Sequence, residues 1–167
     1  GDLIYVVTDK DHRSGVLSFF GCRGRAPENI LIIGGGNIGL RLAMQLENRE
    51  LRVRLLEKDR GRCDMLSQTL NKTIVLHGDG TDQVILLEEN IAHMDMVLTL
   101  TGDEETNMLC SLLTQRLGAR RIITRISKFA YMPIAQAVGL GRVVNPRLSA
   151  INSILQHVRR GKIFSAV

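Results

Sequence analysis

Short apolar runs alternate with amphipathic stretches along most of the chain, and this alternation predicts strands separated by helices. Runs rich in aliphatic residues predict six strands, over Asn29–Ile33, Arg52–Leu56, Thr73–Leu76, Met96–Leu100, Arg121–Ile126 and Val143–Val144. Most are nearly all apolar, as expected where helices cover both faces of a parallel sheet. Right-handed crossovers then predict an α/β fold, a doubly wound parallel six-stranded sheet in the Rossmann order 3-2-1-4-5-6.

The intervening stretches have the period of amphipathic helices. Their apolar stripes are Ile38, Leu42, Met44 and Leu46; Met65, Leu66 and Leu70; Val84, Ile85 and Leu87; and Met108, Leu109, Leu112 and Leu113. The spacing of Thr101 and Glu104 predicts a helix capped by Thr101, and Asn145 before Pro146 predicts a second capped start. That last helix, 147–160, carries a stripe that only the main body or another subunit can cover: Leu148, Ile151, Ile154, Leu155 and Val158.

The segment before the first long strand differs in composition, which predicts a short N-terminal appendage. Residues 1–21 include a β-like run at Leu3–Thr8 but are too few to bury a core, so we expect the tail of a preceding lobe. Glycines and a proline within residues 22–28 predict a linker. Residues 29–167 then form the expected Rossmann lobe.

Composition narrows the possible functions. The chain has 167 residues, 44% of them hydrophobic and 23% charged, which suits a globular core rather than disorder. No apolar stretch approaches the roughly 20 residues of a membrane-spanning helix. The net charge is +5, but the basic residues are scattered without interleaved aromatics, which argues against a nucleic-acid partner. Three widely spaced cysteines favour neither a disulfide framework nor a zinc site, and they fit a reducing cytosol.

A glycine motif follows the first strand and opens the first helix: Gly34, Gly35, Gly36, Asn37, Ile38 and Gly39 match G-x-G-x-x-G. In such a motif the first glycine permits a tight turn, the second admits a phosphate and the third lets the helix pack on the strand. The helix N-terminus suits a diphosphate. Glu57 ends the second strand, where a carboxylate can accept both ribose hydroxyls and repel a 2′-phosphate. The alternative is a glycine-rich turn without a ligand, beside a solvated Glu57.

Later strand ends add polar candidates. Asp79 can accept from an adenine amino group or serve as a turn and helix cap. Thr99, Thr101 and Gly102 end the fourth strand beside the expected switch point. Asn107 either supports the loop that carries Thr101 or is an ordinary polar helix position. Arg125 can meet a phosphate or carboxylate on a neighbouring loop, or have a surface or interface role.

The histidines suggest no catalytic or metal site. His12, His77, His93 and His157 are isolated from one another, and no Cys/His pair or Ser-His-Asp order can be assembled. A dehydrogenase would need a proton donor beside the nicotinamide, which usually comes from a second domain. We therefore expect a nucleotide-binding protein that is not an enzyme.

Four sequence runs together resemble the RCK/KTN family of Rossmann domains, which regulate potassium conductance: 29–39, 55–59, 78–81 and 99–107. The resemblance implies a cytosolic regulatory subunit on the inner membrane, NAD(H) or ATP/ADP as ligand, a dimer or larger ring, and an integral membrane potassium transporter as partner. It also completes the expected cofactor-binding set: Gly34, Gly35, Gly36, Asn37, Ile38, Gly39, Glu57, Lys58, Asp79, Gly80, Thr99, Leu100, Thr101 and Asn107.

Two departures and two rival functions accompany this resemblance. Gly141-Arg142-Val143 stands where such lobes often carry an acidic residue, and Gly80 replaces a frequent alanine. One rival is an enzyme, either an NAD-dependent oxidoreductase fragment or a methyltransferase, although Ile32 and Ile33 stand where methyltransferases usually carry an acid. The other rival is an interaction lobe whose nucleotide site is vestigial.

Overall fold

A computed structural model describes residues 27–161, and the side chains of residues 27–158. The predicted appendage at 1–21 and most of the predicted linker at 22–28 lie outside the described residues. No described helix has both the length and the apolar character needed to cross a membrane.

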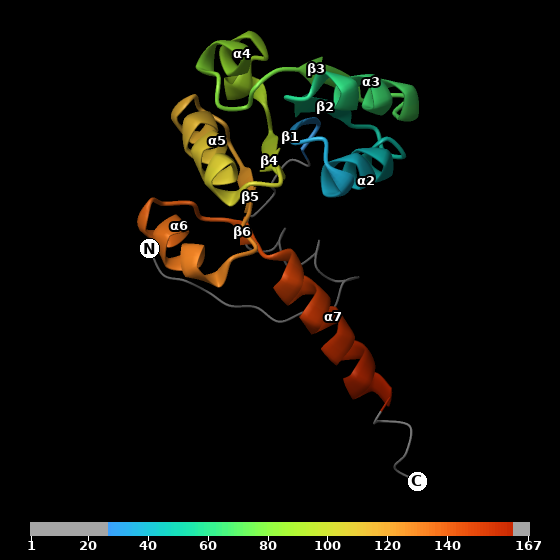
Figure 1. Ribbon diagram of the computed structural model, residues 1–167, viewed down its shortest axis with the longest axis vertical. Helices are drawn as coiled ribbons and strands as arrows, with labels where there is room; N and C mark the ends of the chain where they lie inside the picture. Colours follow the sequence, from blue (N-terminus) through green and yellow to red (C-terminus); the bar gives the residue numbers. More distant parts are fainter. Residues whose placement is uncertain (1–26, 162–167) are drawn as a thin grey trace, which may run out of the picture.

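The six predicted strands are confirmed, with each end within one residue of the expected position. They are β1 Asn29–Ile33, β2 Arg52–Glu57, β3 Ile74–His77, β4 Met96–Thr99, β5 Ile122–Arg125 and β6 Val143–Val144. All pairings are parallel and the order is β3-β2-β1-β4-β5-β6, so the predicted doubly wound sheet is also confirmed (Figure 1).

Helices connect these strands and cover both faces of the sheet. They are α2 Asn37–Leu46, α3 Arg60–Thr69, α4 Gln83–Glu88, η1 Ile91–His93, α5 Glu104–Arg116, η2 Phe129–Tyr131, α6 Met132–Ala137 and α7 Pro146–Gly161. Ile30 and Ile32 of β1 pack with residues of α2 and α3, whereas Leu31 and Ile33 pack with α4, η1 and α5. Successive side chains of a strand point to opposite faces, so β1 joins the two halves of the core.

The buried faces of the helices match the predicted apolar stripes only in part: Leu66 and Leu70 lie in the core and Leu42 and Leu46 pack against it, whereas other members are exposed. In α2 the buried residues are Gly39 and Ala43, while Ile38 and Met44 are exposed. Small residues on the inner face let this helix approach the sheet closely. Several other members of the predicted stripes are also exposed, namely Met65, Val84, Leu87 and Leu109.

Helix α5 buries a polar row beside its predicted apolar stripe. Asn107, Ser111 and Thr114 are fully buried, and they recur at helical spacing. Their polar atoms are hydrogen-bonded to neighbouring strands, loops or the helix itself, and these bonds offset the free-energy cost of burying them. Apolar periodicity therefore found residues that pack against the core, namely Met108, Leu112 and Leu113, but missed the polar row that is buried most deeply.

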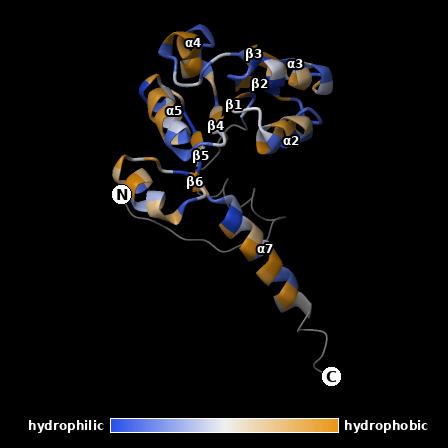
Figure 2. Cartoon of the chain, viewed as in Figure 1, coloured by the Kyte–Doolittle hydropathy of each residue, from blue (hydrophilic) through white to orange (hydrophobic). Residues whose placement is uncertain are grey.

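Helix α7 begins as predicted and then leaves the body of the molecule (Figure 1). The Asn145 side chain accepts from the backbone N–H groups of Arg147 and Leu148, at 3.0 and 3.2 Å, which caps the helix. The apolar stripe on α7 remains exposed to solvent in the described part of the chain (Figure 2). The predicted cover from the main body is thus not provided by the described residues.

Candidate functional site

A cavity of 540 Å³ lies at the carboxyl ends of β1 to β4, where the chain order of the sheet reverses. Open α/β sheets bind ligands at this kind of switch point. We call it the carboxyl-edge cavity. Its lining residues come from the loops after four strands: Ile33, Gly34, Gly36, Leu56, Glu57, Lys58, Gly78, Asp79, Gly80, Thr81, Thr101, Gly102, Asp103 and Thr106.

The glycine turn after β1 depends on close backbone contacts. Gly34 has φ +108°, a conformation that favours glycine, and its N–H donates to the Leu56 carbonyl at 2.8 Å. A Cβ on Gly39 would lie 2.0 Å from the Gly34 carbonyl oxygen. These two glycines therefore let α2 pack against the turn, as their positions in the motif predict.

The start of α2 offers backbone donors to the cavity. Gly36 is the N-cap residue, and no side chain within the described range accepts a capping bond there. A Cβ added to Gly36 would meet nothing within 4 Å, so the space above this position is open. Unpaired N–H groups and the positive end of the helix dipole together attract an anion.

Glu57 forms one wall of the cavity and also fixes the shape of the glycine turn. Its Oε2 accepts from the Gly35 N–H at 2.6 Å, and its Oε1 accepts from the Asp59 N–H at 2.9 Å. Each carboxylate oxygen retains further acceptor capacity toward the cavity. Its contact with ribose stays a prediction, while the support of the turn is a second role that the sequence pattern did not reveal.

Lys58 and Asp79 face each other across the rim of the cavity. The Lys58 ammonium lies 2.7 Å from Asp79 Oδ2, and Asp79 Oδ1 accepts from both the N–H and the hydroxyl of Thr81. The Lys58 hydrogen bond, followed by those from Thr81, lowers the pKa of Asp79 to about 2. Asp79 thus organises a turn, and the helix cap expected as its alternative role belongs to Asp82.

The loop after β4 is held by Asn107, whose side chain is fully buried. Its Oδ1 accepts from the Thr101 N–H at 2.8 Å and from the Thr101 hydroxyl at 2.9 Å. Its Nδ2 donates to the carbonyls of Thr101 and Arg125, both at 3.2 Å. Asn107 therefore supports the loop that carries Thr101, which was one of its two predicted roles.

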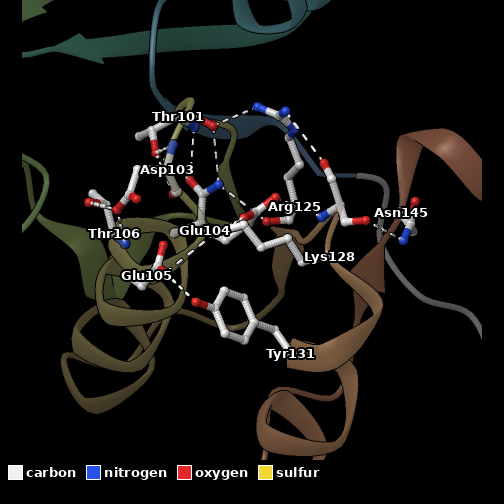
Figure 3. Close-up of polar contacts among 11 residues, drawn as sticks. Thr101, Asp103, Glu104, Glu105, Thr106, Arg125, Lys128, Tyr131 and Asn145 are labelled. Carbon is white, nitrogen blue, oxygen red and sulfur yellow. Dashed lines mark hydrogen bonds and ion pairs between the residues drawn. The ribbon is translucent and has the colours of Figure 1, made fainter.

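Two expectations near this loop need correction or refinement. Thr101 is not the cap of α5, because Asp103 accepts from the Thr106 N–H at 2.7 Å and Thr101 lies two residues before this N-cap position. Arg125 faces inward: its Nη1 donates to the Thr101 carbonyl at 2.7 Å (Figure 3). The described contacts of Arg125 therefore serve the loop, and no carboxylate of the described residues is among them.

The predicted cofactor-binding residues divide into those that line the cavity and those that do not. Lining the cavity are Gly34, Gly36, Glu57, Lys58, Asp79, Gly80 and Thr101. Seven others do not line it: Gly35, Asn37, Ile38, Gly39, Thr99, Leu100 and Asn107. Thr99 is fully buried, and its hydroxyl lies 2.9 Å from that of Ser111.

Several cavity-lining residues were absent from the predicted set. Gly78, Thr81, Gly102 and Asp103 lie on the same loops as predicted residues, and Thr106 lies in the first turn of α5. In the sequence, only their position shortly after a strand end indicated that these residues could lie at the cavity. The Arg62 Nε donates to the Gly35 carbonyl at 2.8 Å, so this side chain of α3 supports the glycine turn. No sequence spacing indicates this contact in advance. Within residues 27–161 no three His, Cys, Asp or Glu side chains are grouped to hold a metal ion.

Comparison with known proteins adds a family and several relatives. The family model described as TrkA-N domain matches residues 30–146. The Trk system potassium uptake protein TrkA of Azorhizobium caulinodans is 39% identical over 165 residues, which cover 98% of this chain and 36% of the relative. The protein of the same name from Halomonas elongata is 38% identical, with 97% and 35% covered. The chain thus spans about a third of the length of these relatives.

Solved structures share the fold at low sequence identity. The NAD(P)-binding domain of an exopolyphosphatase-related protein from Archaeoglobus fulgidus has a TM-score of 0.71 at 18% identity, with 81% of this chain and 99% of that chain covered. The GsuK channel bound to NAD has a TM-score of 0.63 at 19% identity, with 79% and 26% covered. GsuK bound to ADP gives 0.63 and 19%, with 80% and 39% covered.

Proposed function

This chain belongs to the TrkA-N domain family, and on that premise we propose that it is the nucleotide-binding regulatory part of a potassium uptake system. The proposed ligand is an adenine nucleotide, either NAD(H) or ATP/ADP, bound in the carboxyl-edge cavity. The proposed partner is an integral membrane potassium transporter subunit, with the chain acting at the cytoplasmic face of the inner membrane. In this role the nucleotide regulates and is not consumed, so the chain is not an enzyme.

One arrangement carries the proposal: the open N-terminus of α2 and the Glu57 carboxylate face the same cavity. A diphosphate accepts hydrogen bonds and needs positive potential, which the first turn of α2 supplies. A ribose donates through its hydroxyls, and a carboxylate accepts from them. Donors and an acceptor in one cavity therefore match the two halves of an adenosine diphosphate group. The binding of NAD and ADP by GsuK, which shares this fold, supports the same ligand class.

Discrimination among nucleotides follows from the same geometry. The negative charge of Glu57 repels a 2′-phosphate, so NADP(H) is disfavoured. The adenosine diphosphate group is common to NAD(H), ATP and ADP, so Glu57 does not choose among them. The choice then falls to the residues that meet the remainder of the ligand, of which Thr101 and Gly102 at the switch point are candidates.

Regulation requires that the ligand favour one arrangement of the protein over another. The loop that carries Thr101 connects through Arg125 and Ser127 to Asn145, the cap of α7 (Figure 3). Arg125 Nη1 donates to the Thr101 carbonyl, and Asn145 Nδ2 donates to the Ser127 carbonyl at 3.3 Å. We propose that a nucleotide in contact with Thr101 shifts this chain of contacts and thereby the direction of α7. The apolar stripe on α7 is the proposed surface for pairing with a second copy.

Calorimetric titration of the 167-residue chain with NADH, ATP, ADP and NADPH tests the ligand. We expect binding of the first three and weaker binding of NADPH. Glu57→Ala removes hydrogen bonds to a charged acceptor, so we expect a loss of about 1.5–3 kcal/mol in binding free energy. Glu50→Ala, at an exposed acid outside the cavity, is the matched control and should leave affinity unchanged.

Two further readouts separate the proposal from its rivals. The melting temperature of the Glu57→Ala variant without ligand reports how far the substitution disturbs the glycine turn. This structural effect must be separated from any effect on nucleotide binding. Absence of binding of any adenine nucleotide at millimolar concentration would overturn the proposal and favour a vestigial lobe. Turnover of NADH with a substrate would favour the oxidoreductase instead.

A further inference from the structure

Two helix N-termini of opposite electrostatic character border the carboxyl-edge cavity. At the start of α2, the first turn carries no acidic residue and no described side chain caps the helix. At the start of α5, Asp103 caps the helix, and Glu104 and Glu105 occupy the first turn. Gly36 lines the cavity at the first helix, whereas Asp103 and Thr106 line it at the second. The start of α2 therefore attracts an anion, and the start of α5 adds negative charge to the same cavity.

The Asp103 carboxylate keeps its charge at neutral pH. Its Oδ2 accepts from the hydroxyl and from the N–H of Thr106, and these bonds lower the pKa of Asp103. The Lys128 ammonium pairs with Glu104 at 3.2 Å and with Glu105 at 3.6 Å (Figure 3). Among the described residues, no cation forms an ion pair with Asp103. One ammonium thus faces three carboxylates, so the start of α5 remains negative.

The order of the strands places Asp103 at the far end of the proposed ligand. Glu57 at the end of β2 is the proposed contact for ribose, and the start of α2 after β1 is the proposed contact for the diphosphate. The sheet order is β3-β2-β1-β4, so a ligand that runs from Glu57 past α2 continues toward the loop after β4. Thr101, Gly102 and Asp103 of that loop line the cavity. They therefore meet the group that is attached to the adenosine diphosphate.

The candidate ligands differ in charge at this far end. ATP extends ADP by a third, negatively charged phosphate. NADH carries a neutral nicotinamide ring on its second ribose, and the same ring is a cation in NAD+. Like charges repel and opposite charges attract, with an energy that falls with distance. A carboxylate beside the far end therefore weakens the binding of ATP, has little effect on NADH and strengthens the binding of NAD+.

We propose that Asp103 is a specificity-determining residue of the carboxyl-edge cavity, which makes the site select a nicotinamide dinucleotide over a nucleoside triphosphate. This inference rests on the proposed function, because it requires an adenosine diphosphate group in the cavity. Asp103 acts through its charge and is exposed, so water and salt screen its effect. It therefore changes relative affinities and does not exclude ATP.

Calorimetric affinities of ADP, ATP, NADH and NAD+ for the 167-residue chain and for Asp103→Asn test the assignment, at low ionic strength and without divalent cations. Asparagine caps helices as well as aspartate does, so this variant loses the charge and keeps the start of α5. We expect ATP to gain roughly three- to tenfold relative to ADP, and NAD+ to lose affinity relative to NADH. A structural disturbance would shift all four affinities in one direction, so opposite changes report the charge. High salt should reduce both changes.

Asp82→Asn is the matched control. Asp82 is exposed, caps α4 by accepting from the Val84 N–H at 2.8 Å, and does not line the cavity. It follows β3, which is separated from β4 by two strands. We expect this control to leave both affinity ratios unchanged. Asp103→Ser retains a capping oxygen without the charge, so it should repeat the effect of Asp103→Asn.

Failure of this inference and failure of the proposed function give different results. If ADP and NADH bind but Asp103→Asn leaves both affinity ratios unchanged, Asp103 does not select the ligand and the inference alone is overturned. The inference is also overturned if Asp82→Asn changes the ratios as much as Asp103→Asn does. If none of the four nucleotides binds the unmodified chain at millimolar concentration, the proposed function fails and the inference fails with it.

Discussion

The two halves of the sheet reach their positions by different physical means. In the half formed by β1 to β3, the loops at the site come close because side chains are absent: a Cβ on Gly39 or Gly80 would fall within 2.4 Å of a neighbouring atom. In the half formed by β4 to β6, buried polar side chains such as Asn107 and Ser111 connect the elements. The first half depends mainly on close contacts at glycines, to which Glu57 adds hydrogen bonds, and the second depends mainly on buried polar side chains.

This difference determines how each half responds to mutation. A side chain added at Gly39 meets backbone and must move it, so its effect is large and depends on one position. A lost hydrogen bond leaves its former partners unsatisfied, so its effect grows with their number and burial. Substitutions in the two halves therefore form a graded test of the comparison.

We expect the largest effect from Gly39→Ala. The new Cβ would overlap the Gly34 carbonyl oxygen, so α2 must move away from the turn. Overpacking of this kind should lower the free energy of unfolding by about 3 kcal/mol, measured by urea denaturation. Gly36→Ala, in the same motif but facing open space, is the control and should cost less than about 1 kcal/mol. Equal losses of stability in the two variants would show that steric exclusion does not determine the structure of this half of the sheet.

Asn107→Ala should have the next largest effect. It leaves the N–H of Thr101 and the carbonyls of Thr101 and Arg125 without their side-chain partner. We expect about 2 kcal/mol less stability toward urea. Asn107→Asp keeps the acceptor for Thr101 but places a buried carboxylate oxygen against the carbonyls of Thr101 and Arg125, so its loss should be at least as large. If the alanine variant retained full stability, the network would not hold the loop after β4.

Ser111→Ala should cost less, about 1 kcal/mol, because only hydroxyl contacts are lost. Ser111 Oγ lies 2.9 Å from the Thr99 hydroxyl and 2.7 Å from the Thr124 hydroxyl, and so joins β4 to β5. A double-mutant cycle with Thr99→Val should give a coupling energy clearly different from zero. Ser67→Ala, on the exposed face of α3, is the matched control. Strict additivity of the Ser111 and Thr99 substitutions would contradict a shared network.

We expect the smallest effect on stability at the ion pair between Lys58 and Asp79, on the rim of the carboxyl-edge cavity. The folded pKa of Asp79 is lowered to about 2, so its stabilising contribution is complete above the ordinary pKa near 3.8 and disappears as pH falls toward 2. The pKa of Lys58 is raised, which affects stability only at strongly alkaline pH. Because Lys58 is largely exposed, we expect less than about 1 kcal/mol. Unfolding of Asp79→Asn should therefore depend less on pH between 4 and about 2.5 than unfolding of the unmodified chain; identical pH profiles would contradict the assignment.

The sequence predicted the sterically fixed half well because its signals are local. A strand such as Asn29–Ile33, a glycine turn and an acid at the next strand end each occupy a few consecutive positions. Even there, the bonds from Glu57 to Gly35 and Asp59 were not predicted, since they depend on how two loops approach.

The hydrogen-bonded half was predicted less completely. Its order depends on the polar residues with which α5 meets the sheet, Asn107, Ser111 and Thr114, and a search for apolar periodicity does not detect them. The cap of α5 also moved from Thr101 to Asp103, because both residues fit a capping pattern and only the loop geometry decides. Asn145 was predicted correctly as a cap, because the proline that follows it fixes the start of α7.

The most direct test of the central claim is a crystal structure of the chain grown with saturating ADP. The account predicts density in the carboxyl-edge cavity, with phosphate oxygens within hydrogen-bond distance of the amides that begin α2 and the ribose hydroxyls on the Glu57 carboxylate. Density for ADP at another place, with this cavity filled only by solvent, would contradict it.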